Sequence, residues 1–208
     1  MLFRSLKGEF EITLKKARSR EEYEAAIKSA LDETNRIIRL AENLLVLARL
    51  ESKEAFLEKK PLDIGALVQS AVNSMRPLSD IKDIRIFFKP PAKSIVNADE
   101  YQMKTMFLNL LDNAIKYTRQ KGEIWVDSEE LGGDIAIRIK DNGIGIPEDR
   151  IGRIFDRFYR GDIPGDSPGF GLGLSIVRAI AQSHGGKVLV KSAPSAGTTF
   201  TVVLPVLH

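Results

Sequence analysis

The chain has 208 residues and no cysteine, which excludes disulfides and thiolate metal sites. Its hydrophobic content of 43% and charged content of 28% are those of an ordinary globular protein, and no apolar run is long enough to span a membrane. The net charge of +3 comes from basic residues interleaved with acidic ones, which favours solvated surfaces over a nucleic-acid interface.

The first segment, residues 1–57, is predicted to form a helical hairpin. Apolar residues recur three and four positions apart in two runs, residues 2–17 and 23–48. Ser19 and Glu22, between the runs, have the spacing of a capping box that starts the second helix. Because two such helices cannot bury both apolar faces alone, we expect a dimeric four-helix bundle. Packing of the hairpin on the rest of its own chain is the alternative.

The second segment, residues 58–208, is predicted to be an α/β sandwich, a mixed sheet covered on one face by three helices, so that the whole chain is α+β. Asp63 is expected to begin a helix that ends before Pro77, and Asp99 to cap a helix over 100–117. A short helix is expected at 149–158, a loop at 159–170 and a helix at 173–184. The expected strands are 85–89, 123–127, 134–140, 187–192 and 198–204.

Three amide and amine side chains share one face of the helix over 100–117. Asn109, Asn113 and Lys116 are spaced by four and three residues. Amide oxygens are hard neutral ligands that suit Mg²⁺, and the lysine could meet a phosphate. By itself this pattern is equally consistent with a solvated helix face.

Two glycine-rich segments follow. Asp141-Asn-Gly143-Ile-Gly145 comes directly after a strand, where the glycines let a ligand approach the backbone and the carboxylate can accept from an exocyclic amine such as that of adenine. Alone, it is better explained as a strand-end turn. Gly169-Phe-Gly171-Leu-Gly173 opens a helix, whose free N–H groups can bind an anion, although a flexible linker would have the same composition.

The order of these segments resembles the ATP-binding domain of sensor histidine kinases, in the gyrase, histidine kinase and mismatch-repair ATPase superfamily. The asparagine helix matches the N box, the Asp141 turn the G1 box and the later glycine loop the G2 box. The F box is matched by Ile154-Phe155-Asp-Arg157-Phe158-Tyr-Arg160, and the G3 box by Gly197-Thr198-Thr199-Phe200. The resemblance covers residues 61–205, and the hairpin resembles the dimerisation and histidine-phosphotransfer domain.

The resemblance implies a site for ATP and Mg²⁺. It assigns Asn109 and Asn113 to Mg²⁺ and phosphate, with Lys116 on a phosphate and Tyr117 near the base. Asp141 would accept a hydrogen bond from adenine N6, and residues 159–170 would form the lid over the nucleotide. The other implied contacts are Gly143, Gly145 and Ile146 at the adenine wall, Phe158, Arg160 as a candidate phosphate contact, Gly171 and Gly173 near the phosphates with Leu172 and Leu174, and Thr199 close to the adenine pocket.

The chain departs from the family at the phosphate acceptor, a histidine near the start of the first hairpin helix. The only histidines here are His184 and His208, and the register of residues 2–8 would place the acceptor a few residues before Met1. We expect a piece of a longer receptor, with a naturally degenerate kinase as the alternative. His184 is expected to serve the end and the dipole of its helix. No catalytic residue and no autophosphorylation are therefore expected of this chain.

The implied function is that of the cytoplasmic catalytic region of a two-component sensor kinase. Such a region transfers the γ-phosphoryl group of Mg·ATP to a histidine and then, in a phosphorelay, to an aspartate of a response regulator. The implied partners are a second copy, bound through the hairpin, and the receiver domain of a response regulator, with no nucleic acid. The full-length protein would be anchored in the inner membrane through upstream segments.

Two other functions compete with this one. The main alternative is a non-catalytic, nucleotide-gated interaction module that binds a response regulator. A superfamily ATPase that hydrolyses ATP would need a glutamate near the metal to activate water. The helix over 100–117 offers only Glu100, at least two turns from Asn109, which disfavours hydrolysis.

Overall fold

A computed structural model describes residues 19–51, 57–90, 94–160 and 170–207, together with Thr13. The chain divides into two compact units, Met1–Ala48 and Arg49–His208. None of the helices in the described ranges combines the length and the apolar content that a bilayer span requires.

The described helix of the first unit, α2 (Arg20–Glu51), begins with the predicted capping box. Ser19 Oγ accepts a hydrogen bond from Glu22 N at 3.2 Å, and Glu22 Oε2 accepts one from Ser19 N at 2.9 Å. The predicted first helix, residues 2–17, lies outside the described residues except for Thr13, so a hairpin is not evident in the described part of the chain. Three apolar side chains of α2 are more than half exposed: Ile27, Leu31 and Leu45.

The second unit is built on a five-stranded mixed sheet with the strand order β2-β4-β5-β7-β6. The β2–β4 pair is parallel and the other three pairs are antiparallel. A separate antiparallel pair joins β1 to β3. The strands are β1 (Lys60–Asp63), β2 (Arg85–Phe88), β3 (Ile95–Ala98), β4 (Glu123–Leu131), β5 (Asp134–Asp141), β6 (Lys187–Ala193) and β7 (Gly197–Pro205).

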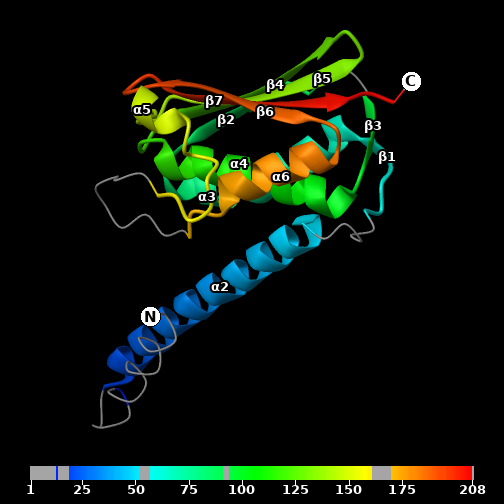
Figure 1. Ribbon diagram of the computed structural model, residues 1–208. Coiled ribbons are helices and arrows are strands. Elements are labelled where there is room, and N and C mark those ends of the chain that lie inside the picture. The colour runs from blue at the N-terminus through cyan, green and yellow to red at the C-terminus, as the bar shows by residue number, and fades with distance from the viewer. Residues whose placement is uncertain (1–12, 14–18, 52–56, 91–93, 161–169, 208) are drawn as a thin grey trace. The chain divides into compact units, whose positions relative to one another are not determined.

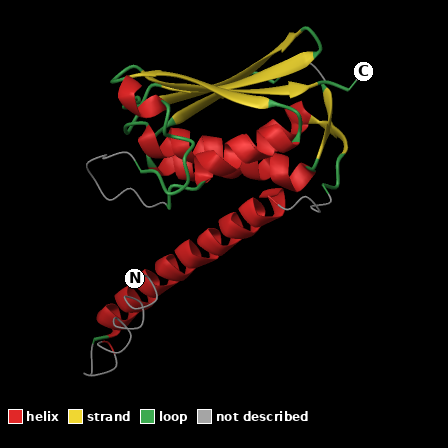
Figure 2. Ribbon diagram, viewed as in Figure 1, coloured by secondary structure: helices red, strands yellow, loops and turns green. Residues whose placement is uncertain are grey.

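Three helices cover one face of this sheet, as predicted: α3 (Ile64–Ile81), α4 (Glu100–Tyr117) and α6 (Gly173–Ser183) (Figures 1 and 2). Alternate residues of β5, including Ile135, Ile137 and Ile139, are buried against them. α4 is covered on its apolar side, where Phe107 and Leu110 are fully buried. This burial fixes the rotation of α4 and therefore the direction of its polar face.

Three predictions of local structure were wrong. Helix α3 does not end before Pro77 but continues through it, because the ring removes only one helical hydrogen bond and tertiary contacts hold the next turn. Ser79 is buried, its Oγ donates to Arg76 O at 2.9 Å, and its carbonyl accepts from Ile84 N at 2.9 Å. Strands β1 and β3, of four residues each, were not predicted. The helix expected at 149–158 is reduced to α5 (Glu148–Ile151).

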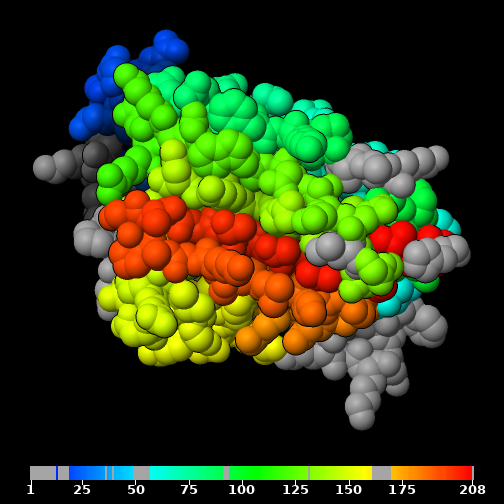
Figure 3. All heavy atoms as spheres, turned by 90° about the horizontal axis from the view of Figure 1, so that it is seen from above, coloured from blue at the N-terminus to red at the C-terminus, as the bar shows by residue number. Residues whose placement is uncertain are grey.

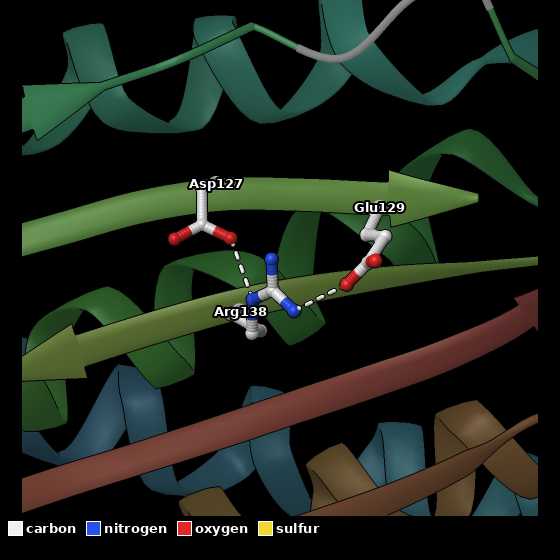
Figure 4. Close-up of polar contacts among 3 residues, drawn as sticks. All are labelled: Asp127, Glu129 and Arg138. Atoms are coloured by element: carbon white, nitrogen blue, oxygen red, sulfur yellow. Dashed lines mark hydrogen bonds and ion pairs between the residues drawn. The ribbon is translucent and has the colours of Figure 1, made fainter. Parts of the chain in front are cut away.

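None of the described helices of the second unit covers the other face of the sheet, and Figure 3 views the second unit from that side. On this face Arg138 of β5 lies between two carboxylates of β4 (Figure 4). Its Nε donates to Asp127 at 2.6 Å and its Nη1 to Glu129 at 2.8 Å. Glu129 and then Asp127 raise the pKa of the guanidinium. Since all three side chains are partly exposed, the cluster is worth at most about 1 kcal/mol of stability per pair.

Candidate functional site

Segments that are far apart in the sequence meet between the sheet and the helices. Ile144 N, in the turn after β5, donates to Tyr117 O at the end of α4, at 3.2 Å. Asn109 Oδ1 lies beside the first residue of α6, Gly173, where an added Cβ would come within 3.0 Å of that oxygen. The structure thus brings the asparagine helix, the Asp141 turn and the Gly171–Gly173 loop together.

Helix α4 presents the three predicted polar side chains on its half-buried side. Asp99 caps the helix, its carboxylate accepting from Gln102 N at 3.0 Å. Asn109 Nδ2 donates to Thr105 O at 3.0 Å, which fixes the amide so that Oδ1 is its remaining acceptor. The Asn113 side chain is half-buried and makes no hydrogen bond within the described residues. Lys116 Nζ lies 5.0 Å from the centre of the Tyr117 ring.

Asp141, the last residue of β5, is the buried carboxylate of the site, with only 4% of its surface exposed. Its Oδ1 accepts hydrogen bonds from Gly143 N at 2.8 Å and Thr198 N at 3.2 Å. Burial raises the pKa of this carboxyl group, and the two backbone N–H groups oppose that shift. Its Oδ2 accepts no hydrogen bond from the described residues. Asp141 therefore offers a fixed and largely buried acceptor.

Thr198, which sequence reasoning did not assign to the site, is the threonine beside Asp141. Thr199 pairs with Lys140 of β5, and because neighbours across a sheet share a face, its side chain lies on the open face, away from Asp141. Thr198 Oγ1 is 2.9 Å from Ser192 Oγ, which in turn accepts from Ile146 N at 2.8 Å. Thr198, Phe200 and Val202 alternate along β7 and are all buried. This alternation was the pattern that could have placed Thr198 on the same side of the sheet as Asp141.

Gly145 is required by the protein's own packing. Its φ is +70°, and an added Cβ would lie 1.9 Å from the carbonyl oxygen of Ala193, the last residue of β6. At Gly143 an added Cβ would lie 2.3 Å from Tyr117 O. The protein's own backbone therefore occupies the space that a side chain would need at either position. The glycines lock the Asp141 turn against α4 on one side and the β6–β7 turn on the other.

Phe158 and Gly171 pair at the two ends of the predicted lid. Phe158 N donates to Gly171 O at 2.9 Å, and both residues have positive φ, +61° and +69°. The exposed Phe158 ring and Arg160 line a cavity of about 740 Å³ that also contains Arg150, Arg153 and Arg157, and neither Asn109 nor Asp141 borders it. Leu172 is buried and Leu174 half-buried, and residues 161–169 of the lid lie outside the described residues.

The oxygen donors that α4 offers to a metal ion are the side-chain amides of Asn109 and Asn113. Within the described residues, no group of three histidine, cysteine or acidic side chains is placed to hold a metal ion. Asn109 Oδ1 and the Asn113 amide are neutral oxygen donors, too few for a protein-only site. They fit a cation that takes most of its ligands from water and phosphate oxygens.

His184 lies at the end of α6, as predicted, but it does not act as a cation there. The ring is 5% exposed, Nδ1 lies 2.8 Å from Ile180 O, and Nε2 accepts from Asp99 N at 3.1 Å. This pairing requires the neutral tautomer with the proton on Nδ1. Burial lowers the pKa of the imidazole, and Lys59 adds to the effect. The ring thus joins the end of α6 to the cap of α4.

Acidification from pH 7.5 to 5.5 is expected to lower the free energy of unfolding through His184. In the unfolded chain the ring takes up a proton near its ordinary pKa of about 6.5, whereas the folded ring resists protonation until a lower pH. The contribution of His184 to the free energy of unfolding is therefore complete above the unfolded pKa of about 6.5, and it is lost as the pH falls from there through the lower pKa of the folded state. Urea unfolding of the wild type and His184→Gln should show the steeper pH dependence in the wild type. Equal dependence in both proteins would contradict this assignment.

Comparison with known families gives one match that covers more than half of the chain. Residues 98–208 match the family described as "Histidine kinase-, DNA gyrase B-, and HSP90-like ATPase". The match includes α4, the Asp141 turn and the start of α6, which are the segments that meet in the structure.

Individual proteins extend the likeness beyond these residues. The chain is 33% identical over 203 residues to the sensor protein IrlS of Burkholderia pseudomallei, covering 97% of this chain and 43% of that protein. The structure resembles full-length ShkA in complex with AMPPNP, with a TM-score of 0.78 and 27% identity over 93% of this chain and 40% of that one. A mycobacterial sensor histidine kinase, MprB, matches with a TM-score of 0.62 and 30% identity over 71% of this chain and 97% of that chain. The chain spans less than half the length of the full-length sensor proteins that it matches, IrlS among them.

Proposed function

Because the chain belongs to the histidine kinase-, DNA gyrase B- and HSP90-like ATPase family and contains the ATP-binding domain of a histidine kinase, we propose that it binds Mg·ATP for phosphoryl transfer to a histidine. The transfer continues to an aspartate of a response regulator. The observation that carries this proposal is Asp141: a buried carboxylate whose Oδ1 is held by two backbone N–H groups while Oδ2 remains available. An acceptor fixed in this way recognises an amino group such as adenine N6.

The phosphate half of the site is assigned to α4 and the start of α6. Asn109 and Asn113 hold Mg²⁺ and the phosphates, and Lys116 neutralises phosphate charge. Gly173 begins α6 directly beside Asn109, so the free N–H groups of that helix face the same region. Phosphoryl transfer depends mainly on positioning and charge neutralisation, which these groups supply. Mg²⁺ held by these amides would supply further neutralisation of the phosphate charge.

Partners are assigned to the first unit. The exposed apolar side chains of α2, Ile27, Leu31 and Leu45, suit a partner helix, and we assign them to a homodimeric four-helix bundle. A response regulator receives the phosphoryl group from the intact kinase, which upstream segments anchor in the inner membrane. The only histidines of this chain are His184 and His208, so the chain lacks the acceptor and does not phosphorylate itself.

Calorimetric titration of the chain with Mg·ATP is expected to give micromolar binding, which Asn113→Ala abolishes. The half-buried amide of Asn113 makes no hydrogen bond within the described residues, so its removal leaves the fold unchanged. Loss of a charge-assisted contact in the phosphate site costs about 1.5–3 kcal/mol, which weakens micromolar binding by about ten- to a hundredfold and brings it toward the detection limit of calorimetry. Arg138→Met, on the opposite face of the sheet, is the matched control and should bind as the wild type does.

Undetectable binding by the wild type would refute the proposal. Radiolabel retained on the chain after incubation with labelled ATP would refute the absence of an acceptor.

The second candidate function, a nucleotide-gated module without catalysis, is favoured by the absence of an acceptor histidine. Binding of a response regulator that is the same with and without ATP would support an interaction module that does not use its nucleotide site for transfer.

A further inference from the structure

Lys82, which follows α3, reaches across to the last turn of α4. Its Nζ donates to Ile115 O and Lys116 O, both at 2.9 Å, and to Thr118 O at 3.5 Å. An ammonium group has three donors and no acceptor, so this side chain is fully used by backbone carbonyls. The positive charge also lies at the negative end of the α4 dipole.

The carbonyls at the end of a helix have no partner within the helix and must find one elsewhere. In α4, Ala114 O accepts from Thr118 N at 3.0 Å and Tyr117 O from Ile144 N at 3.2 Å. Lys82 satisfies the remaining carbonyls, those of residues 115, 116 and 118. One side chain from outside α4 therefore binds two carbonyls of its last turn and a third just beyond it.

The turn that carries Lys82 is itself tightly determined. Asp83 has φ +53° and Lys121 has φ +62°, conformations that cost non-glycine residues about 1–3 kcal/mol each and persist only where surrounding structure imposes them. Lys121 N donates to Lys82 O at 3.1 Å, and Ile84 N donates to Ser79 O at 2.9 Å. The backbone of Lys82 is thus fixed from both sides, which fixes the origin of its side chain.

We propose that Lys82 is a positioning residue of the nucleotide site, acting through Lys116 and Tyr117 on the turn that it holds; this rests on the proposed function. Asp141 accepts one of its two hydrogen bonds from Thr198 N of β7, outside the turn that Lys82 holds. Loss of the Lys82 ammonium therefore displaces the phosphate side of the site more than the adenine acceptor.

The test compares Mg·ATP with adenosine as ligands of the whole chain, by calorimetry and by two-dimensional NMR titration. Lys82→Met keeps the aliphatic stem and is expected to weaken Mg·ATP binding about tenfold, while adenosine binding changes less than about twofold. Lys82→Arg keeps the donors and is expected to restore Mg·ATP binding to within about threefold of wild type. Lys104→Met, at an exposed lysine of α4, is the control and should change neither affinity.

Wild-type affinity for Mg·ATP in Lys82→Met would overturn the positioning role, as would an equal loss for both ligands that arginine does not restore. If Lys82→Met does not fold, Lys82→Gln retains a neutral donor and should show the same selective loss at a smaller size. Absence of Mg·ATP binding by the unchanged chain would overturn the proposed function itself.

Discussion

Asp141→Asn is expected to abolish detectable binding of Mg·ATP without unfolding the protein. The two backbone donors that hold Oδ1 require an oxygen in that position, so the asparagine places its NH₂ group where Oδ2 lies. A donor then meets the exocyclic amine of adenine, and the site loses its acceptor. A buried polar mismatch of this kind reduces binding by at least about a hundredfold.

The same substitution should leave the ligand-free fold as stable as the wild type or make it more stable at neutral pH. Burial raises the pKa of Asp141 in the folded state, so the wild-type protein loses stability as the pH rises from the ordinary pKa of the carboxyl group through its folded pKa. Asparagine is neutral throughout, so its advantage over the wild type grows from acid to neutral pH. Urea unfolding at pH 4 and pH 7 measures this difference.

Arg138→Met again provides the control, because it removes a charge on the open face of the sheet without touching the site. An Asp141→Asn protein that binds Mg·ATP normally would remove the main support for the proposed function. A protein that loses both binding and folding would show instead that the carboxylate has a structural role.

Gly145→Ala is expected to lower the free energy of unfolding by more than about 3 kcal/mol, because two costs combine. A residue with a Cβ resists a φ of +70°, and the new methyl group would lie 1.9 Å from Ala193 O and 3.2 Å from Pro194 Cα. Both obstacles are backbone atoms, which cannot move without displacing the β6–β7 turn. Since that turn precedes Thr198, nucleotide binding should be lost together with stability. Thermal and urea unfolding measure the effect.

Gly132→Ala separates the two costs. Gly132 has a φ of +60°, but an added Cβ there meets nothing within 4 Å. Its substitution should therefore lower the unfolding free energy by only the conformational cost of about 1–2 kcal/mol. Similar losses for Gly132→Ala and Gly145→Ala would show that the contact with Ala193 is relieved by local adjustment.

Much of the fold follows from local pattern. The Ser19–Glu22 capping box and the Asp99 cap form as predicted, because each needs only a side chain within three residues of its backbone donor. The alternation in β5 and the apolar stripe of α4 identify the buried faces, because the periods of strand and helix are fixed by the backbone. The spacing of Asn109, Asn113 and Lys116 placed them on one face of α4 for the same reason.

The sequence alone indicated which segments carry the residues proposed to bind the nucleotide, since the residue types and their spacing are local properties. Tertiary structure alone decided how those residues are held. The Thr198 N–H beside Asp141 depends on the register of β7 against β5, and the neutral His184 depends on the distant Asp99 N–H. Lys82 has no local pattern at all, because its partners are carbonyls more than thirty residues away. Hydrogen bonds between segments depend on packing, and local sequence does not specify packing.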